Sequence, residues 1–154
     1  MIILGLDLSL TETGFCAYDL ATGQILESGV IKTDKKKFKD GDELDRLLHI
    51  CSEIIDLTGK HDIEFAVLEG FSFGSRGQAL FQIAGLSYLV RYHLKCVDID
   101  YSLVPPTALK KWVTKKGNAP KEVMMLHAYK RWKKSFDNNN MCDAFCLCKY
   151  HELS

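Results

Sequence analysis

The first 32 residues contain three runs of β-branched and aliphatic residues separated by short turn signals. The runs cover residues 2–8, 13–19 and 24–32, and Asp19-Leu20-Ala21-Thr22-Gly23 marks a turn between the last two. Short apolar runs bounded by turn residues are typical of strands. We therefore expect the chain to begin with an antiparallel meander of three strands.

The rest of the chain alternates between helix and strand patterns. Residues 42–58 carry apolar side chains at three- and four-residue spacings, which predicts an amphipathic helix. A strand at 63–69, a helix at 77–94 and a strand at 96–104 follow, and Pro105-Pro106 ends the last strand. Short helices are expected at 106–113, 120–133 and 140–152, while 32–42 is a charged surface loop. This order predicts an α/β fold, a mixed five-stranded sheet with helices on both faces.

Length and composition favour one domain. The chain has 154 residues, 47% of them hydrophobic, which suits a single domain over 1–154 with a real core. The longest apolar runs are too short for a membrane span and no signal peptide is recognisable. We therefore expect a soluble, cytoplasmic protein. Six cysteines without a CxxC pair indicate free thiols that pack in a reducing compartment.

A zinc site near the C-terminus is the alternative role for some of these cysteines. Cys142, Cys146 and Cys148 precede His151, in the order C-x3-C-x-C-x2-H. That spacing matches no common structural zinc site, and it fits the packing of a helix better.

Three acidic residues occupy the ends of three different predicted elements. Asp7 and Glu69 each close an apolar strand, and Asp143 opens the C-terminal helix. Carboxylates from separate elements make a site for Mg²⁺ or Mn²⁺, and two such ions about 4 Å apart serve phosphodiester hydrolysis. Each acid taken singly could instead be a cap or a solvated charge. Asp7 is the strongest candidate, because an acid inside an apolar run needs a cation to offset its desolvation.

The net charge of zero conceals an uneven distribution. Residues 1–100 carry 10 Lys+Arg against 16 Asp+Glu, whereas residues 101–154 carry 10 against 4. The C-terminal third is therefore basic, with Trp112 and Trp132 among its lysines and arginines. Such a mixture suits a polyanion, through phosphate neutralisation and aromatic contact, although a solvated helical face has the same composition.

Five segments occur in an order that belongs to a known family. They are Asp7-Leu8-Ser9 with Gly14-Phe15, Glu69-Gly70-Phe71, Pro105-Pro106-Thr107 with Leu109-Lys110, Lys116-Gly117-Asn118-Ala119-Pro120-Lys121, and Asp143-Ala144. Together they resemble the RuvC family of Holliday junction resolvases over nearly the whole chain. The compact chain resembles the phage branch more than the bacterial one. The resemblance implies an RNase H-like fold, a homodimer, metal-dependent hydrolysis and paired nicks in a four-way DNA junction.

The resemblance also assigns roles to individual residues. Asp7 matches a carboxylate that bridges two metal ions, Mg²⁺ or, as a substitute, Mn²⁺, and Glu69 matches one that holds one of them. Asp143 matches the final acid of a helix motif whose preceding ligand position falls on Asn140. The family has Asp or sometimes His there, so Asn140, with a neutral carbonyl oxygen, would coordinate weakly or through water. Asp137 is the alternative fourth ligand if the segment before the helix folds back.

Further residues are expected to touch DNA. The loop after Glu69 holds Phe71, Phe73 and Arg76, and the resemblance implies that one of its aromatics wedges between bases at the crossover. Lysines near the start of the 120–133 helix would bind phosphates, together with Lys110; they are Lys115, Lys116 and Lys121. Lys121 is also a candidate for stabilising charge at the scissile phosphate.

The mechanism and the assembly follow from the same reading. One metal would activate a water and the other would stabilise the departing 3′ oxygen, so no protein nucleophile is needed. The 77–94 helix is apolar on nearly all sides, which favours burial at a two-fold dimer interface, or alternatively deep burial within a monomer.

Three other functions remain open at this level. Residues 7–14 also resemble the phosphate-binding hairpin of ATP-dependent sugar kinases and actin-like phosphotransferases, but those proteins need two related domains. A non-catalytic or weakly catalytic junction-binding protein is compatible with Asn140. A nuclease of this fold could also act on RNA or on simple flaps. A cleavage assay on branched and linear substrates, with ATP and divalent metals, separates them.

Overall fold

The computed structural model describes residues 1–38, 43–70 and 77–154. Five strands form one sheet in the order β3-β2-β1-β4-β5. They are β1 (Ile2–Asp7), β2 (Glu12–Asp19), β3 (Gln24–Lys32), β4 (Phe65–Glu69) and β5 (Asp100–Val104). β2 runs antiparallel to β1 and β3, whereas β4 runs parallel to β1 and β5. The predicted meander and mixed sheet are confirmed.

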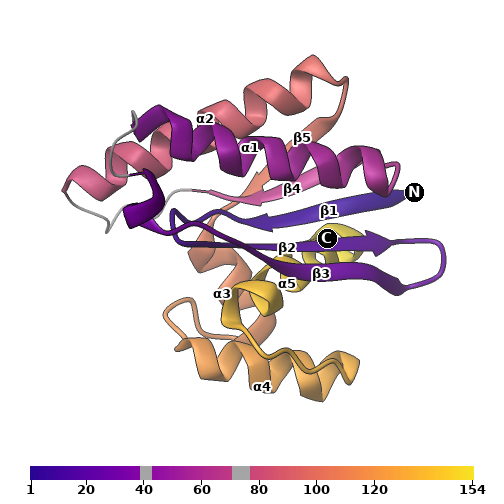
Figure 1. The fold of residues 1–154 in the computed structure, drawn as a ribbon. Helices are drawn as coiled ribbons and strands as arrows, with labels where there is room; N and C mark the ends of the chain where they lie inside the picture. The colour runs from indigo at the N-terminus through magenta and orange to yellow at the C-terminus, as the bar shows by residue number, and fades with distance from the viewer. Residues whose placement is uncertain (39–42, 71–76) are drawn as a thin grey trace.

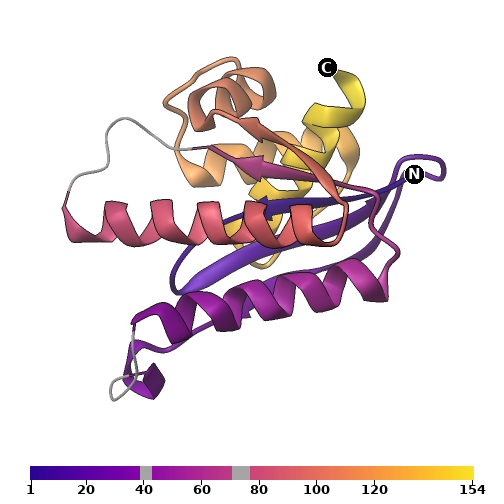
Figure 2. The same cartoon turned by 90° about the horizontal axis from the view of Figure 1, so that it is seen from above.

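Helices cover both faces of this sheet (Figures 1 and 2). On one face lie α1 (Glu43–Lys60) and α2 (Gln78–Cys96). On the other lie α3 (Pro106–Thr114), α4 (Lys121–Trp132) and α5 (Asn139–Leu153). No helix among the described residues is long and apolar enough to cross a membrane.

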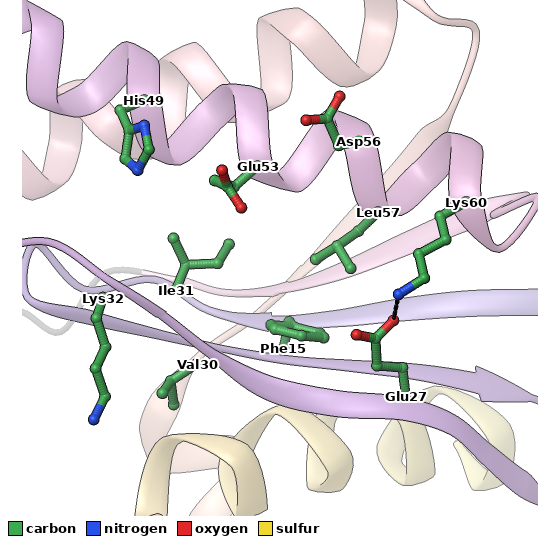
Figure 3. Close-up of a pocket in the computed structure, with 10 residues that line it drawn as sticks. All are labelled: Phe15, Glu27, Val30, Ile31, Lys32, His49, Glu53, Asp56, Leu57 and Lys60. Carbon is green, nitrogen blue, oxygen red and sulfur yellow. Dashed lines mark hydrogen bonds and ion pairs between the residues drawn. The ribbon is translucent and has the colours of Figure 1, made fainter.

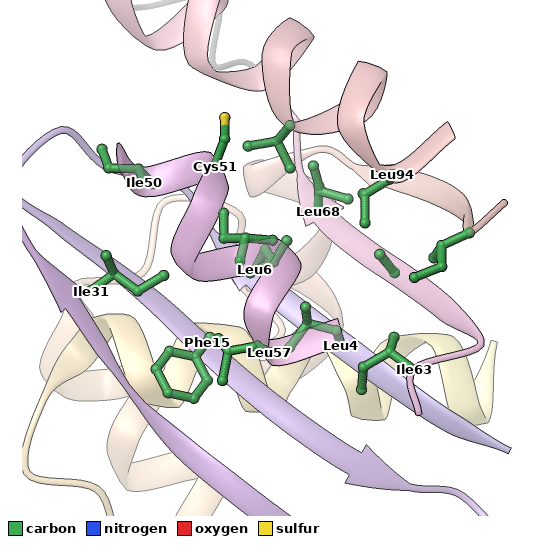
Figure 4. Close-up of a cluster of buried hydrophobic side chains, with 14 of the residues drawn as sticks. Leu4, Leu6, Phe15, Ile31, Ile50, Cys51, Leu57, Ile63, Leu68 and Leu94 are labelled. Atoms are coloured by element: carbon green, nitrogen blue, oxygen red, sulfur yellow. The ribbon is translucent and has the colours of Figure 1, made fainter. Parts of the chain in front are cut away.

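The two-residue period of the strands divides the core into two clusters. Leu4 and Leu6 of β1 point toward α1 and α2, and Ile3 points toward α5. Figure 4 shows the first cluster, in which Phe15, Ile50 and other apolar side chains fill the space between the sheet and the two helices. The second cluster surrounds α5, whose residues 142–148 are all buried.

Two sequence predictions need correction at element boundaries. The strand expected at 96–104 begins only at Asp100, because α2 continues to Cys96 and the chain turns through Asp98, which has a left-handed φ of 58°. The charged loop expected at 32–42 contains a 3₁₀ helix, η1 (Lys35–Phe38), and its residues 39–42 lie outside the described part of the chain.

Candidate active site

Asp7 and Glu69 are the last residues of β1 and β4, two neighbouring parallel strands. The register pairs Leu6 with Leu68, so the two acids that follow leave the sheet together at the same edge. Both side chains are half-buried. In parallel sheets, functional groups gather beyond the carboxyl ends of the strands, because the backbone there turns away from the apolar core.

Asp143 reaches the same edge from α5. Two glycines allow this helix to lie directly on the sheet. A Cβ added at Gly5 would lie 2.1 Å from the carbonyl oxygen of Ala144, and one added at Gly14 would lie 2.1 Å from that of Asn140. Gly14 also pairs with Asp7 in the β1–β2 ladder. The helix turn that bears Asp143 is therefore pressed against the end of β1.

Asp143 is not a helix cap. The N-cap of α5 is Asn138, whose side chain accepts a hydrogen bond of 2.8 Å from the backbone N–H of Asn140. Asp143 lies more than a turn further along the helix and is only 7% exposed. The alternative that it merely caps the helix is therefore wrong.

The environment of the three acids opposes their ionisation. Burial, followed by repulsion from Glu69 and Asp143, holds the pKa of Asp7 well above its ordinary value. Burial and the nearby Asp143 raise the pKa of Glu69 to about 7. Burial raises the pKa of Asp143 to about 6. These shifts mean that three carboxylates share one poorly solvated region.

Two lysines partly offset this negative charge. Lys110 of α3 and Lys121 of α4 each lower the pKa of all three acids by Coulombic attraction. The structure thus brings Lys121, a candidate for the site, together with Lys110, which the sequence had suggested only as a DNA contact. Neither forms an ion pair with the acids within the described residues, so both ammonium groups remain available to a phosphate.

The three carboxylates have chemistry that suits a divalent cation. Across the described ranges, Asp7, Glu69 and Asp143 accept no hydrogen bond and join no ion pair. Hard, negatively charged oxygens without protein donors are the ligands that Mg²⁺ or Mn²⁺ prefers. In the same part of the chain, no three His, Cys, Asp or Glu side chains are already grouped closely enough to hold a metal ion. Binding would therefore draw the carboxylates inward.

Asn140 lies in the first turn of α5, and its side-chain amide is already partly engaged. Its Nδ2 donates a hydrogen bond of 2.9 Å to the backbone carbonyl of Glu12. Only the Oδ1 atom is left to face a cation. Asp137 is exposed and precedes the N-cap. The structure therefore favours Asn140 over Asp137 as the neighbour of Asp143.

The remaining predicted DNA contacts are divided between two regions. Lys115 and Lys116 are exposed in the turn that joins α3 to α4, where Lys115 has a left-handed φ of 69°. Phe71, Phe73 and Arg76 lie outside the described residues.

The two tryptophans of the basic region pack against each other and against α5. Trp112 and Trp132 stack on each other with ring centroids 5.7 Å apart, and both pack against the α5 core cluster. Arg131 lies over both rings. Both rings are half-buried, and Trp112 also lines a surface hollow with Lys111 and Lys115, so aromatic contact with nucleic acid stays a prediction.

The C-terminal cysteines and histidine also pack within the fold. Cys142, Cys146 and Cys148 are buried free thiols, and the His151 ring stacks on Phe65 with centroids 4.7 Å apart. Their side chains belong to the packing between α5 and the sheet.

A hollow of about 410 Å³ lies on the opposite face of the sheet, between β3 and α1 (Figure 3). Its lining includes Glu27, which forms an ion pair of 2.7 Å with Lys60. Hydrogen bonds from Lys60 and His61 lower the pKa of Glu27. The candidate catalytic residues do not line this hollow.

Sequence reasoning missed two contributors to the site. Glu12, at the start of β2, accepts hydrogen bonds from both Asn138 and Asn140 of α5. The contacts join residues more than 100 positions apart, so no local pattern reveals them. Only the position of Asn138 before an expected helix could have indicated its role as an N-cap.

Known proteins that are similar to this chain in sequence or in structure include RuvC proteins. No family model matches the chain. The crossover junction endodeoxyribonuclease RuvC of Brachyspira hyodysenteriae is 25% identical over 127 residues, which is 81% of this chain and 77% of that protein. Thermus thermophilus RuvC in complex with a Holliday junction substrate has a TM-score of 0.78 at 15% identity and covers 96% of this chain and 89% of that one.

A fowlpox virus resolvase solved with Holliday junction DNA has a TM-score of 0.58 at 14% identity. It covers 99% of this chain and 97% of its own. The structural likenesses confirm the predicted RNase H-like fold.

Proposed function

We infer that the chain belongs to the RuvC family of Holliday junction resolvases, and we propose that it is a metal-dependent, structure-selective endodeoxyribonuclease. Its substrates are four-way junctions and other branched DNA, which it cuts by paired nicks. One observation carries the proposal: Asp7, Glu69 and Asp143 share a buried edge of the sheet without hydrogen-bond donors in the described chain, and two lysines face them.

The roles of the site residues follow from their chemistry. Asp7, Glu69 and Asp143 would hold Mg²⁺, or Mn²⁺ in its place, with Asn140 contributing its Oδ1 atom, and two ions per subunit fit this number of oxygens. When bound, divalent cations activate water for attack on phosphorus and stabilise the departing 3′ oxygen. Lys121 and Lys110 would position the scissile phosphate and neutralise charge that develops on it.

The DNA surface extends from this site over α3 and α4. Lys115 and Lys116 lie in the exposed turn between these helices and would contact phosphates of a junction arm. Phe71, Phe73 and Arg76 belong to the loop that follows Glu69, and we propose that they contact bases and phosphates near the crossover.

A homodimer would match the two-fold symmetry of an open junction. Among the described residues, α2 exposes three large side chains at spacings of seven and four, on one helix face: Phe81 at 77%, Tyr88 at 65% and Tyr92 at 65%. Arg91 stacks on the ring of Tyr88, and its buried Nη2 has no hydrogen-bond partner within the described chain. The three exposed rings offer apolar area to a second subunit.

The proposal is tested by incubating the purified protein with a four-way junction, a flap, a linear duplex or ATP, with Mg²⁺ or Mn²⁺ present or withheld. We expect metal-dependent paired nicks in the junction, slower cutting of the flap and little cutting of the duplex. Asp7→Asn is the matched control, since it removes a ligand charge and keeps the shape of the side chain. It should bind junctions and fail to cut them.

Other outcomes would point elsewhere. Tight junction binding without cleavage under any metal condition would favour a non-catalytic junction-binding protein. Asn140, a neutral residue at an expected ligand position, is compatible with that alternative. ATP turnover would favour a phosphotransferase. Metal-dependent cutting by Asp7→Asn as fast as by the wild type would overturn the proposed site.

A further inference from the structure

Two hydrogen bonds join the start of β2 to the start of α5. Asn138 Nδ2 donates to the carboxylate oxygen Oε2 of Glu12 at 3.0 Å. Asn140 Nδ2 donates to the backbone oxygen of the same residue at 2.9 Å. Asn138 Oδ1 in turn accepts from the N–H of Asn140. We call this arrangement of Glu12, Asn138 and Asn140 the clasp.

On the sheet side, the clasp is linked to Asp7 by a stiff hairpin. Thr13 is fully buried, and its hydroxyl donates to the carbonyl of Ser9 at 2.7 Å and accepts from the Ser9 N–H at 3.1 Å. Thr33 donates its N–H to the carbonyl of Thr11 at 2.9 Å. The segment between Asp7 and Glu12 is therefore held by its own hydrogen bonds.

Arg46 of α1 fixes the same hairpin from the other face of the sheet. Its Nη2 donates to the carbonyl of Leu10 at 2.6 Å, and its Nε donates to the hydroxyl of Thr33 at 2.8 Å. The hairpin between Asp7 and Glu12 is therefore held from both faces of the sheet.

On the helix side, the clasp is linked to Asp143 by the first turn of α5. Residues three apart on a helix lie on one face, so Asn140 and Asp143 move as a unit. The clasp thus joins the hairpin that follows Asp7 to the helix turn that bears Asp143. An ionised aspartate side chain at position 140 has no N–H to donate, so the bond to the Glu12 carbonyl requires the amide.

We propose that Glu12 and Asn138 are positioning residues, which hold together the strand and the helix that bear Asp7 and Asp143, so that a divalent cation can draw the two carboxylates in. The inference rests on the proposed function and assigns a second layer of residues to the same site. Groups that orient metal ligands act on affinity for the ion without touching it. In this chain they do so by joining the strand that bears one ligand to the helix that bears another.

The decisive variant is Asn138→Ser. Serine is an equally good N-cap, so α5 keeps its start, but its short side chain cannot reach Glu12. We expect the Mg²⁺ concentration for half-maximal junction cleavage to rise about tenfold, within the range seen when partners of metal ligands are removed, with the rate at saturating Mg²⁺ kept within about twofold. Without DNA, the Mg²⁺ concentration that half-saturates the rise in melting temperature should increase by a similar factor.

Two further variants separate positioning from a general loss of structure. Asn139→Ser makes the same change at the next residue, whose side chain forms no hydrogen bond within the described chain, and should behave as the wild type. The double variant Glu12→Gln with Asn138→Asp keeps the total charge and exchanges donor and acceptor, since the amide introduced on β2 would donate to the carboxylate introduced before α5. It should restore metal affinity to within about threefold of the wild type, as one hydrogen bond replaces another.

The possible results distinguish the clasp from the function on which it rests. The clasp is overturned if Asn138→Ser needs no more Mg²⁺ than Asn139→Ser in either measurement, or if the exchanged pair is as impaired as Asn138→Ser. A wild-type protein that is stabilised by Mg²⁺ but cuts no junction overturns the nuclease proposal. The Mg²⁺ dependence of melting in Asn138→Ser and Asn139→Ser then still tests whether the clasp positions the metal ligands.

Discussion

Each of the three acids lowers the stability of the folded chain when its carboxyl group is ionised. They are Asp7, Glu69 and Asp143. Each carboxyl group has a pKa above its ordinary value, with burial as the largest cause. A fold optimised for stability alone would place apolar side chains there. Acids that remain at such positions are typical of sites where a cation completes the structure. The stability of the folded chain is therefore coupled to the binding of a cation at the three acids.

This coupling predicts how stability depends on pH. Without divalent cations, the folded chain keeps protons on Glu69 up to a pKa of about 7 and on Asp143 up to about 6. The unfolded chain releases these protons near pH 4. Between the unfolded and the folded pKa values, unfolding therefore releases protons, and the stability of the folded chain falls as pH rises. We expect melting temperatures in EDTA to decline between about pH 4 and pH 7, and Mg²⁺ to reverse much of the decline.

Asp7→Asn is the control for this effect. It removes one of the repelling charges, so at about pH 8 in EDTA it should melt above the wild type, by roughly 2–4 °C for each kcal/mol recovered. Its response to Mg²⁺ should be weaker. Calorimetry across the pH series makes the comparison, and equal pH profiles for the two proteins would contradict the assignment of Asp7 to the shared acidic region.

Asn140→Asp tests the position where the chain departs from the pattern of the RuvC family that it resembles. A carboxylate adds a full negative charge to a set of oxygen ligands, and this gain should outweigh the loss of one clasp bond, so the Mg²⁺ concentration for half-maximal cleavage should fall. The same change removes the Nδ2 donor to the Glu12 carbonyl, so the metal-free protein should lose about 1 kcal/mol of stability. Titration of cleavage with Mg²⁺ and melting in EDTA measure the two effects. Unchanged metal dependence, with activity lost in Asp137→Asn, would make Asp137 the fourth ligand.

The sequence singled out the three acids that the structure brings together, but it did not indicate their surroundings. Asp7 and Glu69 stand out because each closes an apolar run, and Asp143 because of its resemblance to a family motif. The bonds from Asn138 and Asn140 to Glu12 could not be predicted, because hydrogen bonds between distant segments leave no periodic signal. The same holds for Lys110, whose proximity to the acids depends on the packing of α3.

Strand pairing and close packing bring together the elements that carry the acids. β1 and β4 bring Asp7 and Glu69 to one edge because they are parallel neighbours. α5 brings Asp143 there because Gly5 and Gly14 leave its backbone in direct contact with the sheet. Strand and helix periodicity predicted these elements well. It did not indicate that the helix would lie so close, since a glycine in a strand is also compatible with a bulge or a weak strand.

Gly14→Ala tests this contact. The added Cβ would lie 2.1 Å from the carbonyl oxygen of Asn140, so α5 must shift away from β2. We expect a loss of about 1–3 kcal/mol or more, as for other overpacked sites, and a larger fall in cleavage than the loss of folded protein explains. Chemical denaturation and cleavage assays at a temperature where the variant is folded measure both.

Gly59→Ala is the matched control, since nothing lies within 4 Å of the added Cβ and the residue belongs to α1. It should stabilise the chain by about 0.5–1 kcal/mol through helix propensity. Equal effects from the two substitutions would show that the contact of α5 with β2 is not tight.

At the scale of the molecule, the two faces of the sheet have different roles. The face of α3, α4 and α5 carries the lysines around the acids, whereas the face of α1 and α2 carries the exposed aromatic side chains of α2. Composition predicted the basic C-terminal third. It also predicted an apolar helix at 77–94, but not which residues of that helix would remain exposed, because exposure depends on how α2 packs against α1 and the sheet.

Phe81→Glu tests whether the exposed face of α2 forms the dimer interface. A charge within an apolar contact is strongly unfavourable, so the variant should sediment as a monomer at concentrations where the wild type is a dimer. Paired nicking should become single nicking. Leu48→Glu, at an exposed apolar residue of α1, is the control and should remain dimeric. A dimeric Phe81→Glu protein would place the interface elsewhere.

The final prediction concerns the basic surface, where charge acts over distances larger than any one contact. Each lysine that neutralises a duplex phosphate releases counterions and adds about 0.9 to the slope of log K against log salt. Replacing Lys115, Lys116 and Lys121 with alanine should therefore lower the slope of junction binding by roughly 2 to 3. The measurement is a binding titration in Ca²⁺ over a series of salt concentrations, with Lys60→Ala as a control on the opposite face. Lys60 already pairs with Glu27, so its removal should leave the slope unchanged. If the triple variant also keeps the wild-type slope, these lysines form a solvated face, and the junction arms must follow another path across the molecule.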